Sequence, residues 1–218
     1  MGQQEARLEP CGSCRLATLC VDRQTVVSQL NAGVTLQRQG EEARGIVRIH
    51  SGLALQTVCD RHGEELRCVL RGPGATLNLE AVLGEETWSE VLALTELEVC
   101  ITPLSVVAPH LGDPDEPGFA LFQMAVTEAW HCMDQKRLRH GAAASRVARL
   151  LMSASDLLGD GVQIDPPLRT LSRGVGIRPE TMSRALAQLR AAGGIEEGRP
   201  LRIRDRAVLE DLGSASSD

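Results

Sequence analysis

The sequence predicts an α+β protein made of an antiparallel β-roll, a long helix and a C-terminal helix-turn-helix. Between residue 22 and about residue 108, short apolar runs alternate with turn signals such as GEEARG, DRHGEE and RGPGA, which is typical of antiparallel strands. From Glu116 to about His140, apolar residues recur at helical spacing. Two short helical patterns then flank Gly176, within residues 168–193.

Turn signals and composition divide the chain into five predicted parts. We expect a cysteine-rich arm at 1–21, a β-roll at 22–115, a long helix at 116–140, a helix-turn-helix domain at 141–212 and a disordered tail at 213–218. The tail, GSASSD, is small and polar, without apolar anchors. A chain of 218 residues buries enough surface to fold without disulfides.

Targeting signals are not recognisable in the sequence. The first twenty residues lack a basic segment followed by an apolar run, and no stretch is long and apolar enough to cross a bilayer. We therefore expect a cytoplasmic protein with no membrane partner. In that compartment, seven cysteines indicate metal binding or redox chemistry rather than a disulfide framework.

The net charge of −6 hides a basic C-terminal segment. Residues 161–206 contain five acidic side chains and nine arginines, at positions 169, 173, 178, 184, 190, 199, 202, 204 and 206. Because DNA responds to the local potential rather than to the whole-chain charge, this segment is a candidate for binding nucleic acid.

The long helix carries an apolar seam. Its members recur one turn apart, and they are Phe122, Val126, Ala129 and Met133. Such a seam packs either on the β-roll of its own chain or on a second copy in a coiled coil. The length of the helix and its place between two domains favour a homodimer interface.

The helix-turn-helix has a first helix that ends at Gly176, which suits the positive φ of a tight turn, and a second that starts near Pro179. Met182, Leu186 and Leu189 are predicted to face the core. The outward side chains are Glu180, Ser183, Arg184 and Arg190.

In the major groove of DNA, the outward side chains have defined chemistry. Glu180 can accept a hydrogen bond from the cytosine amino group, and Arg184 can bind guanine through O6 and N7. Ser183 can reach a base or a phosphate. The alternative is a solvated face on an ordinary helical hairpin.

Cys11, Cys14 and Cys20 form a Cys-x2-Cys-x5-Cys cluster that can wrap one metal centre. A fourth ligand must come from the remaining cysteines, at positions 59, 68, 100 and 132. Zinc is one alternative, but all-cysteine zinc sites usually contain two Cys-x2-Cys pairs. An iron-sulfur cluster accommodates the three-plus-one arrangement better.

Over nearly its whole length, the chain resembles FNR, the oxygen-responsive branch of the CRP/FNR transcription regulators. The cysteine arm, the roll, the long helix and the helix-turn-helix reading Glu180-Thr181-Met-Ser183-Arg184 carry the resemblance together. It implies a jelly-roll sensor domain of the cyclic-nucleotide-binding kind, a dimerisation helix and a winged helix-turn-helix that binds double-stranded DNA.

The resemblance also implies a cofactor. The segment LEVCITPL resembles the stretch around the fourth cluster cysteine of FNR, which makes Cys100 the expected partner of Cys11, Cys14 and Cys20. Under low oxygen, these thiolates would hold a [4Fe-4S] cluster that stabilises the dimer. Oxygen would convert the cluster to a [2Fe-2S] form, loosen the dimer and release DNA.

Target recognition and polymerase contact follow by the same resemblance. Glu180, Ser183 and Arg184, with Arg178 and Thr181 beside them, imply a palindrome similar to TTGAT-N4-ATCAA. The loop formed by Gly63, Glu64 and Glu65 resembles the one that contacts RNA polymerase in activators, although a plain hairpin turn is an equal alternative.

Two residues of the arm bear on the cluster. Leu19 matches an apolar position that shields the cluster from oxygen. Arg15 departs from the family, in which a small polar residue is usual after the second cysteine, and its charge would favour an anionic cluster.

Other functions receive less support. A cyclic nucleotide is not expected, because residues 74–91 contain no arginine or lysine and a phosphate would meet Glu80, Glu85 and Glu86. A response to nitric oxide or to thiol redox state, with zinc or a dithiol switch, is the alternative sensing chemistry. Enzymatic activity is not expected, because the sequence has no phosphate loop, no HExxH motif and no nucleophile elbow.

Overall fold

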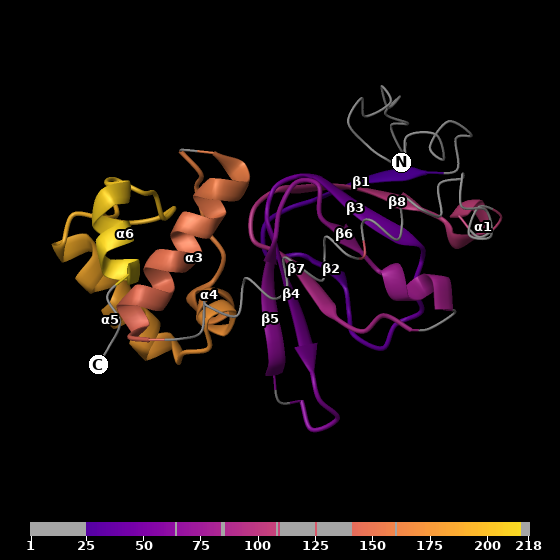
Figure 1. Ribbon diagram of the computed structural model, residues 1–218, viewed down its shortest axis with the longest axis horizontal. Helices are drawn as coiled ribbons and strands as arrows, with labels where there is room; N and C mark the ends of the chain where they lie inside the picture. Colours follow the sequence, from indigo (N-terminus) through magenta and orange to yellow (C-terminus); the bar gives the residue numbers. More distant parts are fainter. Residues whose placement is uncertain are drawn as a thin grey trace.

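The computed structural model consists of a β-roll beside a helical domain (Figure 1). It describes residues 25–63, 65–83, 86–107, 109, 125, 141–159 and 161–214. The predicted cysteine arm and the predicted dimerisation helix, with its seam residues Phe122, Val126, Ala129 and Met133, lie outside the described residues. None of the described helices has the length and apolarity needed to span a bilayer.

The β-roll consists of two four-stranded antiparallel sheets, which confirms the fold predicted for this part of the chain. One sheet has the order β1 (Val26–Leu30), β8 (Leu97–Thr102), β3 (Ile46–Ser51) and β6 (Thr76–Leu77). The other has the order β2 (Thr35–Gln37), β7 (Glu90–Ala93), β4 (Ala54–Cys59) and β5 (Glu65–Arg71). A short 3-10 helix η1 (Leu79–Leu83) and helix α1 (Leu104–Val107) complete the roll.

Strand alternation explains how the roll closes. Successive side chains of a strand point to opposite faces, so Val47 and Ile49 of β3 and Leu97 and Val99 of β8 enter one shared core. The turn between β3 and β4 requires Gly52, which has φ +86°. A Cβ at this position would lie 2.0 Å from the carbonyl oxygen of Glu96.

The helical domain contains α3 (Ala143–Leu158), α4 (Leu168–Val175), α5 (Pro179–Ala191) and α6 (Arg206–Ser214). The predicted helix-turn-helix is confirmed: α4 ends at Gly176 in the left-handed conformation, and α5 has Pro179 in its first turn. Short antiparallel bridges, Ile164 to Leu201 and Ile195 to Ile203, form the wing.

The C-terminal boundary differs from the prediction. Helix α6 runs to Ser214, and Gly213 is buried, where a Cβ would lie 2.8 Å from the methyl group of Met152. Two residues of the predicted tail are therefore helical, because the tertiary contact with α3 extends a helix that the sequence ends early.

Candidate nucleic-acid interface and cysteine site

The second helix of the helix-turn-helix, α5, presents the predicted DNA-contacting side chains to solvent. Arg178, Glu180, Ser183 and Arg184 are exposed, and Thr181 is half-buried. On the opposite face, Met182, Leu186 and Leu189 are buried, as predicted. Because residues three and four apart share a helix face, Glu180, Ser183 and Arg184 form one continuous surface.

The orientation of α5 is set by the turn that precedes it. The N–H groups of Gly176 and Ile177 donate to the carbonyl oxygens of Arg173 and Ser172, which closes the end of α4. From α3, Arg146 donates to the carbonyl oxygens of Val175 and Gly176, both at 3.4 Å. The turn is thus held by hydrogen bonds to α4 and to α3, and these bonds fix the direction of α5 relative to α4.

Only some of the nine arginines in the basic segment are free to meet a phosphate. Five form ion pairs within the protein, and these are Arg173, Arg190, Arg199, Arg202 and Arg206. The other four are exposed and make no side-chain hydrogen bond or ion pair to any described residue: Arg169, Arg178, Arg184 and Arg204. The structure thus adds Arg169 and Arg204 to the candidate DNA contacts.

Arg190 does not face outward as the helical pattern suggests. Its side chain is 22% exposed and lies 3.7 Å from the carboxylate of Glu197. It also donates to the carbonyl oxygen of Gly198 at 3.0 Å. The prediction was wrong because the wing, which is remote in the helical pattern, folds back over the end of α5.

Cys100 lies on β8, opposite Val27 of β1 in the sheet register. Its neighbours Leu97 and Val99 face the roll core, so alternation places the Cys100 side chain on the other face of the sheet. The residue is nevertheless only 4% exposed. Val27 follows Cys20 by seven residues, which extended chain covers in at most about 24 Å.

Cys59 and Cys68 belong to the other sheet. Cys68, on β5, is 5% exposed and lies in the core shared with the helical domain, and Cys59 on β4 is half-buried. Burial raises the pKa of the Cys68 thiol to about 11, against smaller lowering effects of the Thr57 hydrogen bond and the Arg173 charge. Neither cysteine lies in the sheet that contains β1, the strand that follows the arm in the sequence.

We expect the stability of the protein to fall between about pH 9 and pH 11 because of Cys68. The unfolded state releases the thiol proton from its ordinary pKa of 9.0, whereas the folded state holds it to about 11. The contribution of Cys68 to stability is therefore complete below pH 9, and stability decreases by up to about 3 kcal/mol as pH rises to the folded pKa of about 11.

Urea unfolding of the wild type and of Cys68→Ala across this range measures the effect. The chain has no tyrosine and a single lysine, so the groups that titrate there besides Cys68 are mainly the other six cysteines, which both proteins share. Equal pH slopes for the two proteins would contradict the assignment.

The other predicted ligands and shielding residues, Cys11, Cys14, Cys20, Leu19 and Arg15, lie outside the described residues. Within the part of the chain that is described, no three His, Cys, Asp or Glu side chains come together as a metal site. The structure therefore places one candidate ligand, Cys100, and leaves the assembled site as a prediction.

The predicted polymerase loop is an exposed turn between β4 and β5, at the end of a hairpin that projects from the roll (Figure 1). The N–H of Gly63 donates to the carbonyl oxygen of Asp60 at 3.0 Å, and Gly63 has φ +78°. Glu65 begins β5, and Glu64 lies outside the described residues. This geometry suits a plain hairpin turn and a contact loop equally.

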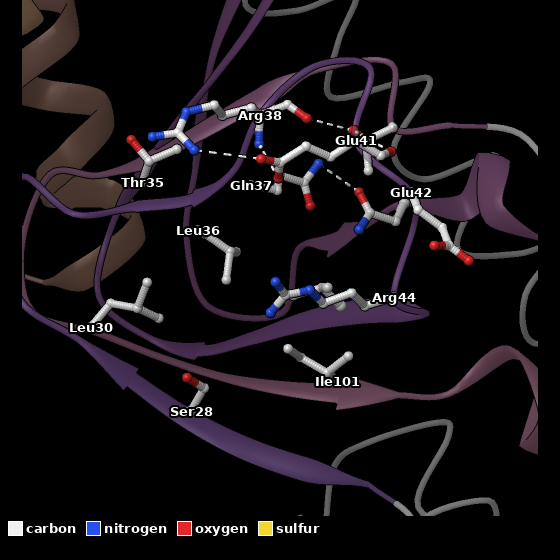
Figure 2. Close-up of a pocket in the computed structure, with 13 residues that line it drawn as sticks. Ser28, Leu30, Thr35, Leu36, Gln37, Arg38, Glu41, Glu42, Arg44 and Ile101 are labelled. Atoms are coloured by element: carbon white, nitrogen blue, oxygen red, sulfur yellow. Dashed lines mark hydrogen bonds and ion pairs between the residues drawn. The ribbon is translucent and has the colours of Figure 1, made fainter.

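A cavity of about 310 Å³ opens inside the roll (Figure 2). Its apolar wall includes Leu30, Leu36 and Ile101. Its charged rim comes from the β2–β3 connection and contains Arg38, Glu41, Glu42 and Arg44. Glu80 and Glu86, two of the carboxylates that were expected to repel a phosphate, do not line the cavity, and Glu85 lies outside the described residues.

The charged residues at the rim of the cavity include equal numbers of arginines and glutamates. Arg38 lies 3.5 Å from the carboxylate of Glu41. The backbone N–H of Arg38 donates to the same carboxylate, which lowers the pKa of Glu41. Two arginines and two glutamates thus share the rim, and a phosphate at Arg38 would displace the ion pair with Glu41.

We expect neither cyclic AMP nor cyclic GMP to bind in this cavity. Neither nucleotide, at about 1 mM, should shift the thermal midpoint, because a ligand stabilises only the state that binds it. A midpoint increase that Arg44→Ala abolishes would contradict this expectation and would assign the cavity to an anion.

The comparisons with known proteins agree with this architecture. The Crp-like helix-turn-helix domain family matches residues 145–212, which contain most of α3, the helix-turn-helix, the wing and most of α6. No curated protein sequence matches the chain.

Several solved structures share the fold. FixK2 from Bradyrhizobium japonicum is 21% identical, with a TM-score of 0.71 over 88% of this chain and 99% of that one. TTHA1359, a transcriptional regulator of the CRP/FNR family from Thermus thermophilus, is 20% identical, with a TM-score of 0.67 over 88% and 100%.

TTHB099, a CRP-family transcriptional regulator from the same organism, is 22% identical, with a TM-score of 0.66 over 87% and 97%. Residues 145–212 thus form a Crp-like helix-turn-helix domain, and the chain as a whole has the fold of these solved structures.

Proposed function

We propose that this protein is a DNA-binding transcription regulator of the CRP/FNR type, and within it of the FNR kind, in which Cys11, Cys14, Cys20 and Cys100 hold a [4Fe-4S] cluster. The cluster would make dimerisation along residues 116–140, and thereby binding to an FNR-type palindrome, depend on oxygen. The observation that carries the proposal is the position of Cys100 opposite Val27, on the strand next to the one that follows the arm.

The donor set fits the cofactor chemically. Thiolates are the usual ligands of iron-sulfur clusters, and the arm supplies three of them within ten residues. The register sets Val27, seven residues after Cys20, opposite Cys100, which supports this cysteine as the fourth ligand, whereas Cys59 and Cys68 belong to the other sheet. When bound, the cluster supplies an oxygen-reactive centre that ties the arm to the roll.

In this proposal, the cluster controls DNA binding through the dimer. Two recognition helices must lie about one turn of DNA apart to bind a palindrome, so whatever stabilises the dimer stabilises binding. Arg184 and Glu180 would read bases, while Arg169, Arg178 and Arg204 would contact phosphates. In this proposal RNA polymerase is contacted through the turn at Gly63, Glu64 and Glu65.

The proposal is tested by an absorption spectrum of protein purified without oxygen, repeated after air is admitted, with iron and sulfide assayed on the same sample. We expect a brown protein with a broad band near about 400 nm, about four irons per chain and spectral change in air. A colourless protein that contains zinc would contradict the proposal and would favour thiol or nitric oxide chemistry at the same cysteines.

A further inference from the structure

The helical domain shares a hydrophobic core with the β-roll. One cluster of buried residues contains Leu55 and Leu70 of the roll together with Leu171 and Val175 of α4. Figure 1 shows α4 beside strands β4 and β5. A shared core of this kind indicates that the two domains are docked rather than merely linked.

Two glycines allow this close approach. A Cβ at Gly174 of α4 would lie 3.3 Å from Cδ1 of Leu55, and a Cβ at Gly72, after β5, would lie 2.9 Å from Cβ of Leu157. Neither glycine has a positive φ, so backbone conformation does not require glycine at these positions. Their small size is what brings the roll and the helices into contact.

An ion pair crosses the same interface. The guanidinium of Arg173 on α4 lies 3.3 Å from the carboxylate of Glu90 on β7. In the sheet, Glu90 pairs with Thr57, and Thr57 pairs with Cys68, so these residues form one row beneath α4. Arg173 belongs to the basic segment, but its guanidinium pairs with the roll and is therefore not available to DNA.

We propose that Glu90, Arg173, Gly72 and Gly174 form a latch that holds the DNA-binding domain on the roll and fixes the direction of the recognition helix. None of the four needs to touch DNA. Because only the turn at residues 176–178 separates α4 from α5, docking of α4 also orients α5. The docked arrangement leaves Glu180, Ser183 and Arg184 exposed, so it is compatible with DNA binding.

A latched domain binds a palindrome more tightly than a mobile one. Two recognition helices must meet two half-sites with fixed spacing, and a domain that already points in one direction loses less freedom on binding. The latch should therefore affect affinity for the palindrome much more than affinity for random DNA. This inference requires DNA binding by α5 but does not require the cluster.

A volume swap across the interface tests the latch. Gly174→Val adds three carbons against Leu55, and Leu55→Ala removes three from the same contact. We expect each single variant to weaken palindrome binding about tenfold and the double variant to recover most of the loss. A charge swap, Glu90→Arg with Arg173→Glu, should follow the same pattern with smaller effects, because both side chains are about one-third exposed.

Cys68 reports domain opening directly, since its thiol is buried beneath α4. Site-resolved alkylation, measured by mass spectrometry, should be about tenfold faster at Cys68 in the single variants and near wild type in the doubles. Arg206→Gln is the matched control, because its ion pairs with Asp156 and Glu210 lie within the helical domain. Amide exchange in β3 and α5 shows whether each domain stays folded.

The results separate the alternatives. Single variants that bind the palindrome as tightly as the wild type, or more tightly, would overturn the latch, as would doubles that fail to recover while both domains remain folded. If the wild type itself does not bind the palindrome, the proposed FNR function fails, and Cys68 alkylation still decides whether the domains are latched.

Discussion

Cys100→Ala is expected to lower the iron content from about four per chain to almost none and to abolish anaerobic binding to the palindrome. The proposed site would then have three thiolates, and Cys59 and Cys68, the other cysteines that the structure describes, lie in the other sheet. Iron assay and gel-shift titration, both without oxygen, measure the two effects. The arm variants Cys11→Ala, Cys14→Ala and Cys20→Ala should behave in the same way.

Cys68→Ala is the matched control for this prediction. Both cysteines lie on strands of the roll, and their exposed fractions are nearly equal, 4% for Cys100 and 5% for Cys68. The control should keep its iron and its DNA binding, as should Cys59→Ala and Cys132→Ala. Retention of iron in Cys100→Ala together with loss in Cys132→Ala would show that the fourth ligand was misassigned.

Arg184→Ala is expected to weaken binding to the palindrome by about 1 to 3 kcal/mol and to reduce selectivity for guanine at the contacted position. The side chain is exposed on α5 and pairs with no described residue, so its removal leaves the fold intact. The effect is measured by titration against three DNAs: the palindrome, a palindrome in which the contacted guanine is replaced by another base, and random DNA. An equal loss on all three sequences would make Arg184 a phosphate contact.

Arg169→Ala and Arg204→Ala provide the contrast for Arg184. As phosphate contacts, they should weaken binding to specific and random DNA alike, and each should reduce the salt slope of log K by about 0.9. Arg206→Gln should change neither affinity, because Arg206 is held by Asp156 and Glu210.

Much of the fold was predictable because local patterns specify it. The apolar positions of α5, the left-handed Gly176 and Pro179 at the helix start are all readable from short segments of sequence. The turn signals between residues 22 and 108 likewise predicted an antiparallel roll. Local conformational preferences and periodicity were sufficient because tertiary contacts did not override them at these positions.

The partnerships of charged side chains were not predictable in this way. Counting arginines marked residues 161–206 as basic, but Arg190 folds against the wing and Arg173 pairs with Glu90, 83 residues away. The arginines at the cavity rim were missed for the same reason. Arg38 and Arg44 lie outside residues 74–91, the segment in which a phosphate-binding arginine was sought.

By itself, the sequence determined the order of domains, the recognition helix with its candidate base-reading residues, and the cysteine spacing that suggests a cluster. Only the tertiary structure decided which arginines remain free for DNA, that Cys100 lies opposite Val27 while Cys68 is enclosed between domains, and that α4 docks on the roll. The physical reason is the sequence separation over which each kind of interaction acts. Helix, turn and strand preferences act over a few residues, whereas ion pairs, burial and domain contacts join residues that only the folded chain brings together.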